Sequence, residues 1–331
     1  MKKSYVAFII VFLLLLSACS QNNAQQNTES TEAAATLPES NFPEKTIQLI
    51  LPIPAGSSYD VLARTIADEV KQHLPNQQSV VVVNKPGGAN TMGVSEIFNA
   101  KPDGYTIGFI PTSTLTTAPH YGNTPYTFDS FQPIIRISRV DGMVYVRDEE
   151  PFKTFEEWIA YVKENPGKFS IGTVQGGKAV LTKLNKDAGI ETNVVPFDGS
   201  ALAMTAFLGE HVNAVLAVPA EAKELVDSGE IRPIFSTSGS KIEDAPILKE
   251  KGFNIEENKM TGIIAPKGLP KEELTILHDA FKKALEAPKT IELIEKLGLQ
   301  PFYGPPDEFQ TSLSDSFKLD GETLKAAGLI K

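Results

Sequence analysis

The chain has 331 residues, of which 41% are hydrophobic and 22% charged, which is enough apolar material for a sizeable core and excludes wholesale disorder. The formal net charge of -10 argues against a general nucleic-acid binder, although a local site could still hold a small anion. One cysteine excludes an intrachain disulfide and a multi-cysteine zinc site, and the four histidines show no metal-ligand spacing, so we expect neither metal nor cofactor.

Residues 1–18 have the organisation of a secretory signal. Lys2 and Lys3 precede an apolar run over 6–16, and small residues follow it up to Cys19. The run is shorter than the roughly 20 apolar residues that cross a bilayer, so it predicts a cleaved signal peptide. A signal that ends at a cysteine resembles the bacterial lipobox, which implies a palmitate-bearing lipoprotein anchored through Cys19. An ordinary signal with an incidental cysteine is the alternative.

Residues 19–42 predict a flexible tether. Polar residues and alanine dominate this stretch, and almost nothing in it could be buried. A lipid anchor and a tether would place the globular part outside the cytoplasm, near a membrane but not in it. No later segment is apolar enough to span a bilayer, so a transport function would need separate membrane subunits.

Beyond residue 42, short apolar runs alternate with helical stretches, which is typical of α/β architecture. The first unit is predicted to be βαβαβ. Its strands are expected at 46–52, 79–83 and 105–110, and its helices at 61–74 and 91–100.

A second unit of the same type is expected to start near residues 131–140. Its strands are predicted at 143–146, 169–172, 192–195, 214–218 and 231–236, and its helices at 155–165, 179–188, 202–208 and 221–227. Thr154 and Glu157 predict a capping box at the start of the first of these helices. One more strand is expected at 261–265, with C-terminal helices at 271–286 and 289–298.

Two α/β units suggest two lobes. If the C-terminal tail returns to the first unit, lobe 1 comprises residues 43–138 and 258–331, lobe 2 comprises 139–257, and the chain crosses near 138 and 258. Two separate consecutive domains are the alternative. No fixed-period repeat is visible, so a solenoid is not expected.

The strongest local signal for a site is the turn Pro54–Asp60, between the first strand and the first helix. Gly56 allows a tight turn and close approach of a ligand, while Ser57 and Asp60 can cap the helix. The helix start presents free N–H groups, as in carboxylate and phosphate sites. A capped turn that binds nothing explains the same residues equally well.

The turn Asn84–Asn90 occupies the equivalent place after the second strand and contains Gly87 and Gly88. Turns at the carboxyl ends of neighbouring strands face one crevice, where open α/β sheets bind ligands. Neither turn matches a dinucleotide or P-loop motif, so nucleotide binding has little support.

Further candidates follow later strands. Thr112 and Ser113 add hydroxyl groups after the third strand, or they cap a helix. In the second unit, Gly177 with Lys178 and Gly199 follow strands in the same way, and Lys178 could attract an anion or simply be solvated. No nucleophile elbow or other catalytic constellation is present, so we expect no catalytic residue and no enzyme activity.

At these residues the chain resembles a known family. Pro-Ala-Gly at 54–56, Asn-Lys-Pro-Gly at 84–87, Pro-Asp-Gly-Tyr at 102–105, Asn-Pro-Gly-Lys at 165–168 and Ala-Pro-Lys-Gly-Leu-Pro at 265–270 look like the Bug family. These are the solute-binding proteins of tripartite tricarboxylate transporters. The resemblance covers nearly all of residues 45–310.

The resemblance implies a type II periplasmic-binding-protein fold, with two α/β lobes joined by crossing strands and a carboxylate bound between them. Carried over by position, the residues of the two turns that would offer main-chain amides to the ligand are Ala55, Gly56, Ser57, Gly87 and Gly88. Asp60 would order the first turn, and Thr112 and Ser113 match a hydroxyl segment of the family. The loops of the facing lobe would contribute Gly177, Lys178 and Gly199.

Departures from the family leave the ligand open. Ser57 stands where the family usually has a second glycine, Asn90–Thr91 replace a longer glycine run, and Lys178 lies near a usual serine. Lys178 could favour a more highly charged acid, a di- or tricarboxylate.

These observations lead to one functional hypothesis: a monomeric, lipid-anchored extracytoplasmic protein that delivers a carboxylate to transporter membrane subunits. A sensory protein that presents its ligand to a membrane receptor kinase is the alternative. A hydrolase or transferase that uses the same cleft is disfavoured by the missing nucleophile and base.

Overall fold

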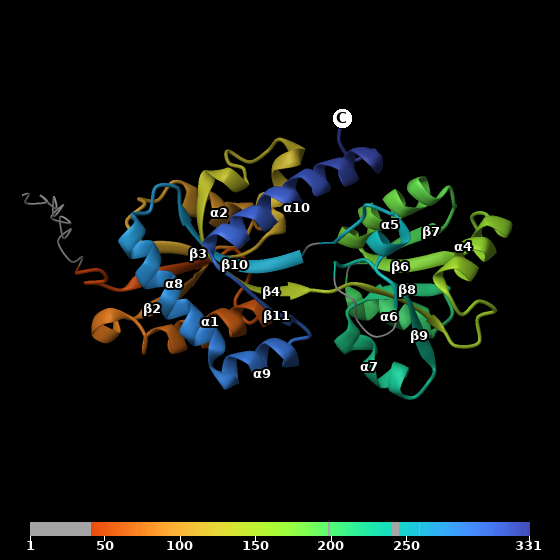
Figure 1. The fold of residues 1–331 in the computed structure, drawn as a ribbon, viewed down its shortest axis with the longest axis horizontal. Coiled ribbons are helices and arrows are strands. Elements are labelled where there is room, and N and C mark those ends of the chain that lie inside the picture. Colours follow the sequence, from red (N-terminus) through yellow and green to blue (C-terminus); the bar gives the residue numbers. More distant parts are fainter. Residues whose placement is uncertain (1–40, 198, 240–244, 258) are drawn as a thin grey trace, which may run out of the picture. The chain divides into compact units, whose positions relative to one another are not determined.

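The computed structural model describes residues 41–197, 199–239, 245–257 and 259–331. The predicted signal peptide, Cys19 and almost all of the predicted tether lie outside the described residues. Within the described part, no helix is both long and apolar enough to cross a membrane. The chain forms two β-sheets, each flanked by helices on both faces (Figure 1).

The first sheet has six strands in the order β11-β4-β10-β3-β1-β2. Three of them are parallel neighbours and three are paired antiparallel. The parallel strands are β1 (Ile47–Leu51), β2 (Val80–Asn84) and β3 (Thr106–Pro111), and the others are β4 (Phe131–Val140), β10 (Lys259–Pro266) and β11 (Gln300–Gly304). The helices of this lobe are α1 (Ser58–Val70), α2 (Thr91–Phe98), α3 (Ser113–Thr116), α8 (Lys271–Glu286), α9 (Pro288–Lys296) and α10 (Pro306–Ala326).

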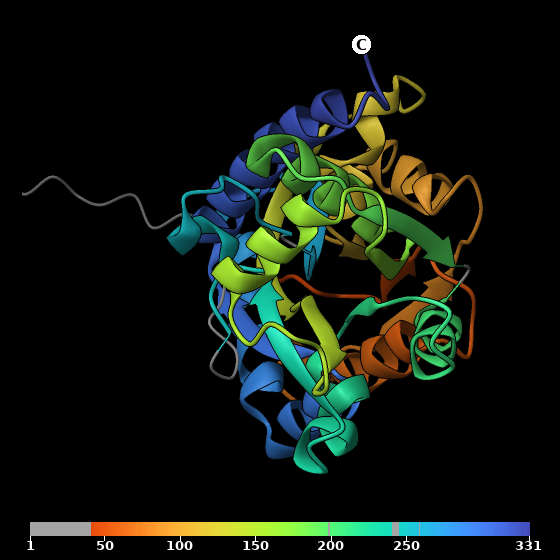
Figure 2. The ribbon, with the colours of Figure 1, turned by 90° about the vertical axis from the view of Figure 1, so that its right-hand side faces the viewer.

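The second sheet has five strands in the order β7-β6-β8-β5-β9 and faces the viewer in Figure 2. Its strands are β5 (Met143–Arg147), β6 (Ser170–Val174), β7 (Asn193–Phe197), β8 (Ala214–Ala217) and β9 (Ile231–Ser236). Its helices are α4 (Phe155–Glu164), α5 (Gln175–Ala188), α6 (Ser200–Leu208) and α7 (Pro219–Asp227).

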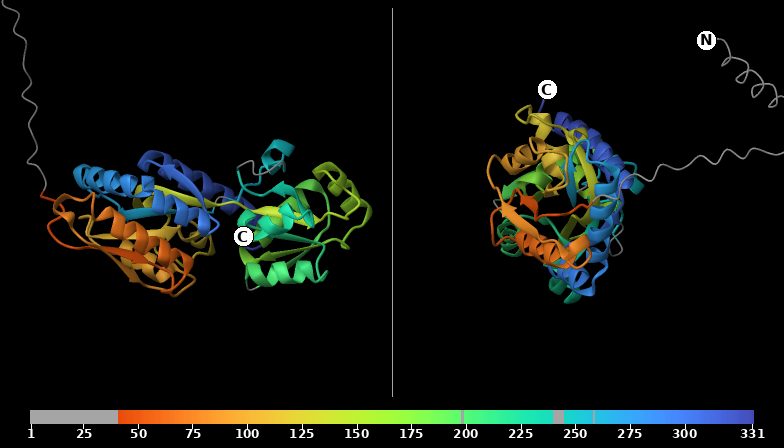
Figure 3. Two further views of the ribbon diagram at one scale, coloured as in Figure 1. Left: turned by 90° about the horizontal axis from the view of Figure 1, so that it is seen from below. Right: turned by 90° about the vertical axis from the view of Figure 1, so that its left-hand side faces the viewer.

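The chain leaves the first sheet after β4, builds the whole second sheet and returns to the first sheet in β10. The segments that join the sheets can be followed in Figure 3. Strands that follow residue 258 therefore belong to the first sheet, and the molecule has the two-lobed α/β architecture that the resemblance implied.

Burial patterns explain the elements that the sequence predicted correctly. Four of the five residues of β1 are buried, which suits a central strand covered on both faces. In α1, buried residues recur at helical spacing, as in Leu62, Ile66 and Val70, and they join the core of the first lobe. Thr154 and Glu157 form both hydrogen bonds of the predicted capping box.

Several predictions about elements were wrong. The strand β4 at 131–140 was not predicted; it pairs with β10 and β11 in the first sheet, in agreement with the lobe boundary expected near residue 138. The helix expected at 61–74 runs from Ser58 to Val70, and the helix expected at 179–188 already begins at Gln175. The strand β11 and the helix α10 were missed, because prolines at 301, 305 and 306 mark a break that hid both elements.

Candidate functional site

The carboxyl ends of three parallel strands lie at one edge of the first sheet. Leu51 at the end of β1 is paired with Asn84 at the end of β2, and β3 runs parallel on the other side of β1. The turns that follow these strands are consequently neighbours. This is the edge at which open α/β sheets bind ligands.

Asp60 organises the turn after β1. Its Oδ2 accepts hydrogen bonds from the Gly56 N–H at 3.0 Å and from Arg64 Nε at 3.1 Å. Its Oδ1 accepts from Asn84 Nδ2 at 2.9 Å and lies 3.0 Å from Arg64 Nη2. Ser57 is the N-cap of α1 and accepts from the Asp60 N–H. The network ties the first turn to the end of β2, so Asp60 orders the turn as predicted.

These hydrogen bonds favour the ionised form of Asp60. The Arg64 side chain, followed by the Gly56 amide and the Asn84 side chain, holds the pKa of this buried carboxyl at about 2, although burial itself opposes the shift. Asp60 is therefore a fixed negative charge at ordinary pH, and it neutralises the guanidinium of Arg64 on α1. Side-chain charge at the turn is already satisfied within the protein.

One predicted amide provider needs correction. The Gly56 N–H is bound to Asp60 and is not free for a ligand. Helix geometry instead leaves the N–H groups of Ser58 and Tyr59 without an acceptor inside α1, since they belong to its first turn. The sequence signal for these two donors was the capped helix start itself. Ala55 and Gly56 are exposed, and Ser57 uses its hydroxyl as the cap.

The turn after β2 has an unusual backbone. Four consecutive residues, 87–90, have positive φ, with values of 128° at Gly87, 57° at Gly88, 53° at Ala89 and 72° at Asn90. Asn90 tolerates the left-handed conformation better than most residues, which explains how it replaces a glycine here. A Cβ on Gly87 would lie 2.4 Å from the Met92 sulfur.

Lys85, in the same turn, is bound within the protein. Its Nζ lies 3.2 Å from Glu96 Oε2 on α2. The two glycine-containing turns therefore offer main-chain groups, whereas the bases beside them, Arg64 on α1 and Lys85 in the second turn, already have carboxylate partners.

Thr112 and Ser113, the two hydroxyl-bearing residues after β3, differ in exposure. Thr112 is fully buried, and its Oγ1 accepts a hydrogen bond from the Met260 N–H of β10 at 3.2 Å. That contact fixes the end of β3 to β10. Ser113 is exposed at the start of α3.

In the second lobe, Gly177 and Lys178 lie in the first turn of α5, not in a loop. Gly177 is buried, and a Cβ there would lie 2.2 Å from Thr173 Oγ1 and 2.6 Å from Leu216 Cδ2. The glycine therefore lets α5 pack closely on its sheet. Lys178 is half-buried, and Gly199 is the N-cap of α6 in an extended conformation.

A cavity of about 190 Å³ brings residues of both lobes together. Ser113, Thr116 and Thr117 line it from the first lobe, and Ala179 and Val180 of α5 line it from the second. Asp320 of α10 also lines it, and Thr117 Oγ1 donates to its Oδ2 at 2.6 Å. Burial raises the pKa of Asp320, while the threonine hydrogen bond opposes that rise.

Asp320 was missed from the sequence. It lies in a polar stretch whose helix was itself not predicted, so no local signal marked it. Only the packing of α10 against both α3 and α5 brings it to the cavity.

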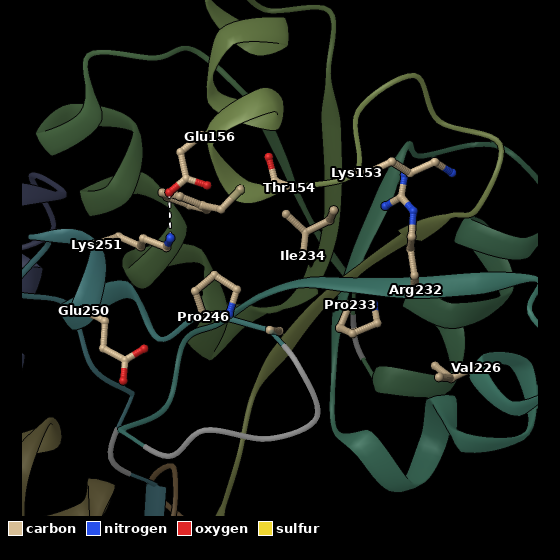
Figure 4. Close-up of a pocket in the computed structure, with 12 residues that line it drawn as sticks. Lys153, Thr154, Glu156, Val226, Arg232, Pro233, Ile234, Pro246, Glu250 and Lys251 are labelled. Atoms are coloured by element: carbon tan, nitrogen blue, oxygen red, sulfur yellow. Dashed lines mark hydrogen bonds and ion pairs between the residues drawn. The ribbon is translucent and has the colours of Figure 1, made fainter.

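A larger cavity of about 700 Å³ lies in the second lobe (Figure 4). None of the predicted ligand residues lines it. Two of its basic side chains have carboxylate partners: Lys251 lies 2.6 Å from Glu156, and Arg232 lies 3.0 Å from Asp148. Across the described residues, no group of three or more histidine, cysteine or acidic side chains could hold a metal ion.

Comparison with known proteins identifies the family. The profile described as "Tripartite tricarboxylate transporter family receptor" matches residues 62–329. The chain belongs to this family. It is 32% identical over 305 residues to "UPF0065 protein in gbd 5'region" of Cupriavidus necator, covering 88% of this chain and 90% of that protein.

Solved structures agree with the family assignment. A TctC solute-binding protein from Polaromonas is 29% identical with a TM-score of 0.80, over 86% of this chain and 99% of that one. R. palustris Rpa4515, solved with adipate, is 25% identical with a TM-score of 0.65, over 87% of this chain and 99% of that one. The tricarboxylate-transporter receptor described here is thus an extracytoplasmic solute-binding protein, and its periplasmic-binding-protein fold confirms the expectation from the sequence.

Proposed function

We propose that this receptor captures a small di- or tricarboxylate at the strand-end turns of its two lobes and delivers it to the membrane subunits of a transporter. The observation that carries the proposal is the pair of adjacent turns after β1 and β2, held together by Asp60, Arg64 and Asn84. The adipate bound to R. palustris Rpa4515 supports the ligand class.

Main-chain donors suit this ligand. Hydrogen bonds to a charged acceptor contribute about 1.5–3 kcal/mol each, and the start of a helix favours negative charge. We assign the first carboxylate to the turn residues Ala55 and Ser57 with the amides of Ser58 and Tyr59, and to Gly87 and Gly88. Gly56 and Asp60 shape the turn after β1, and Thr112, next to Ser113, fixes the end of β3 to β10.

The facing lobe would contribute the second contact. Gly177, Lys178 and Gly199 all lie at or just after the starts of helices that follow parallel strands. Lys178 supplies a positive charge that suits the second carboxylate of a dianionic acid. Binding would then favour one arrangement of the two lobes over others, which is how such receptors signal occupancy.

A ligand screen tests the proposal. Acetate, adipate and citrate are added to the purified protein, and thermal unfolding is followed. A ligand at about 100 times its dissociation constant should stabilise the fold by roughly 2.7 kcal/mol. Stabilisation by adipate or citrate but not by acetate is expected, and no response to any di- or tricarboxylate would refute the assigned ligand class.

Two variants in one turn locate the site. Gly87→Val should weaken binding of the responding acid strongly, because it adds a side chain where the backbone must approach the ligand. Lys85→Ala should leave affinity nearly unchanged, since Lys85 is paired with Glu96. Calorimetric titration measures the affinity of both variants, after circular dichroism has shown that each is folded. Strong loss with Lys85→Ala and none with Gly87→Val would place the site on side-chain charge instead.

We further propose that Cys19 carries the lipid anchor and that a monomer works at the membrane surface on the 19–42 tether. Cys19→Ala should release the protein from the membrane fraction without changing ligand affinity. Retention of the variant in that fraction would favour another mode of attachment. A sensory role uses the same binding step, and co-purification with a transporter subunit or a receptor kinase separates the two.

A further inference from the structure

Three chain segments meet where the chain crosses between the two sheets. They contain Gly142, just before β5, Thr237, just after β9, and Glu257, two positions before β10. The Thr237 N–H donates to the Gly142 carbonyl at 2.9 Å, and the Glu257 N–H donates to the Thr237 carbonyl at 2.6 Å. Thr237 therefore joins the outgoing crossing to the returning crossing through main-chain hydrogen bonds.

The carboxylate of Glu257 is packed into this junction. Thr237 Oγ1 donates to its Oε2 at 3.1 Å, and a Cβ on Gly142 would lie 2.9 Å from that same oxygen. Only 7% of the Glu257 side chain is exposed. A carboxylate buried to this extent is strongly unfavourable unless a cation compensates it.

Each crossing supplies such a cation two positions from the acid. Lys259, the first residue of β10, pairs with Glu257. Arg139 of β4 pairs with Asp141, whose side chain is 1% exposed, at 3.2 Å from Nε to Oδ1. Arg139 faces Met260 in the β4–β10 ladder, so the two bases lie on neighbouring strands. These four residues line one cavity of about 100 Å³, which Glu256 also lines.

The elements that these residues belong to make the pairs sensitive to rotation at the crossings. Lys259 belongs to β10 of the first sheet, whereas Glu257 is hydrogen-bonded to Thr237, which follows β9 of the second sheet. Hinges act by changing φ and ψ at a few residues at the ends of elements. Rotation at either crossing therefore changes the separation of the acid and the base across it.

We propose that the Glu257–Lys259 and Arg139–Asp141 ion pairs form a latch on the pivot between the two lobes. Both pairs favour the lobe arrangement in which they are intact. Lys259 is the positioning residue that can best be tested, because its side chain is 39% exposed and its removal leaves the core packing in place. The latch acts on the protein without ligand, so the test of the latch does not depend on which carboxylate the protein binds.

Distance measurements on the unliganded full chain test the latch. Because Cys19 is the only cysteine, Cys19→Ala with Asp68→Cys on α1 and Lys163→Cys on α4 carries one nitroxide on each lobe. Pulsed electron paramagnetic resonance then gives the distribution of the distance between lobes. Lys259→Gln is expected to shift or broaden this distribution, and Lys259→Arg, which can keep the pair, should retain it.

Lys267→Gln is the matched control, because it removes the same charge just beyond the other end of β10. If Lys259→Gln fails to fold, the distance distribution is measured on the double variant Glu257→Gln/Lys259→Gln. That variant leaves no unpaired buried charge at this pair and still releases the latch. A distribution for folded Lys259→Gln, or for the folded double variant, that overlays that of the unmodified protein would overturn the proposal. So would an equal shift caused by Lys267→Gln.

Discussion

Asp60 shows how one side chain determines the shape of the first turn. Its two oxygens accept hydrogen bonds from the Gly56 amide, Arg64 and Asn84, and these partners keep its pKa at about 2 in the folded protein. In the unfolded chain the pKa of an aspartate is about 3.9. Because the folded value is the lower one, the ionised carboxylate stabilises the fold above about pH 4, and this contribution is lost as the pH falls toward 2.

Asp60→Asn is expected to lower the free energy of unfolding by about 1–2 kcal/mol at pH 7, because it removes the charge from these hydrogen bonds. The difference from the unmodified protein should narrow between about pH 4 and pH 2. Urea unfolding at a series of pH values measures both effects.

Asp68→Asn is the control, since Asp68 is exposed on the same helix. It should change stability little at any of these pH values. A deficit for Asp60→Asn that stayed constant down to pH 2 would show that the charge of Asp60 does not contribute.

At the scale of elements, helix α5 packs on its sheet through a glycine. Gly177 is buried, and its missing side chain leaves room for Thr173 of β6 and Leu216 of β8. Thr173 Oγ1 is buried and has no hydrogen-bond partner within the described residues. The contact between α5 and its sheet at Gly177 thus depends on van der Waals packing and not on a hydrogen bond of Thr173.

Gly177→Ala is expected to lower the free energy of unfolding by about 1–3 kcal/mol, because the added methyl group overpacks this contact. Adding Thr173→Ala should restore part of the loss, since it removes the nearest atom and breaks no hydrogen bond. A double-mutant cycle in urea, with Thr173→Ala alone as the reference, gives the coupling. Strictly additive effects would mean that the two positions do not compete for the same space.

At the scale of the whole molecule, each lobe has its own core. Trp158 is the only tryptophan of the chain, and it is buried among Phe155, Phe169 and Phe235 of the second lobe. Phe281 belongs to the core of the first lobe. Tryptophan fluorescence therefore reports unfolding of the second lobe, whereas far-UV circular dichroism reports both.

Phe235→Ala is expected to destabilise the second lobe by about 3–5 kcal/mol. Its fluorescence transition in urea should then occur at a lower concentration than the final part of the circular dichroism transition. Phe281→Ala should instead leave the fluorescence midpoint close to that of the unmodified protein. Coincident fluorescence and dichroism transitions in both variants would mean that the lobes unfold as one unit.

Local patterns by themselves determined the α/β class, most of the element positions and the places of the glycine-containing turns after β1 and β2. These features depend on the spacing of apolar residues, on glycine and on capping side chains, all of which act over a few neighbours in the chain. The lipobox and tether predictions depend on local composition in the same way. The lipobox and the tether up to residue 40 remain predictions, since those residues lie outside the described part of the chain. The tether prediction was wrong at its end, because Phe42 is buried in the core of the first lobe.

Only the tertiary structure decided which donors are free and which strands share a sheet. The pairing of β4 with β10 and β11 joins residues far apart in the chain, and short apolar runs do not reveal their partners. Likewise, Gly56 loses its free amide because Asp60 bonds to it, and Thr112 is buried because Met260 lies against it. Such hydrogen bonds depend on how the folded chain brings groups together, so the sequence could mark the turns but could not distinguish their free donors from their occupied ones.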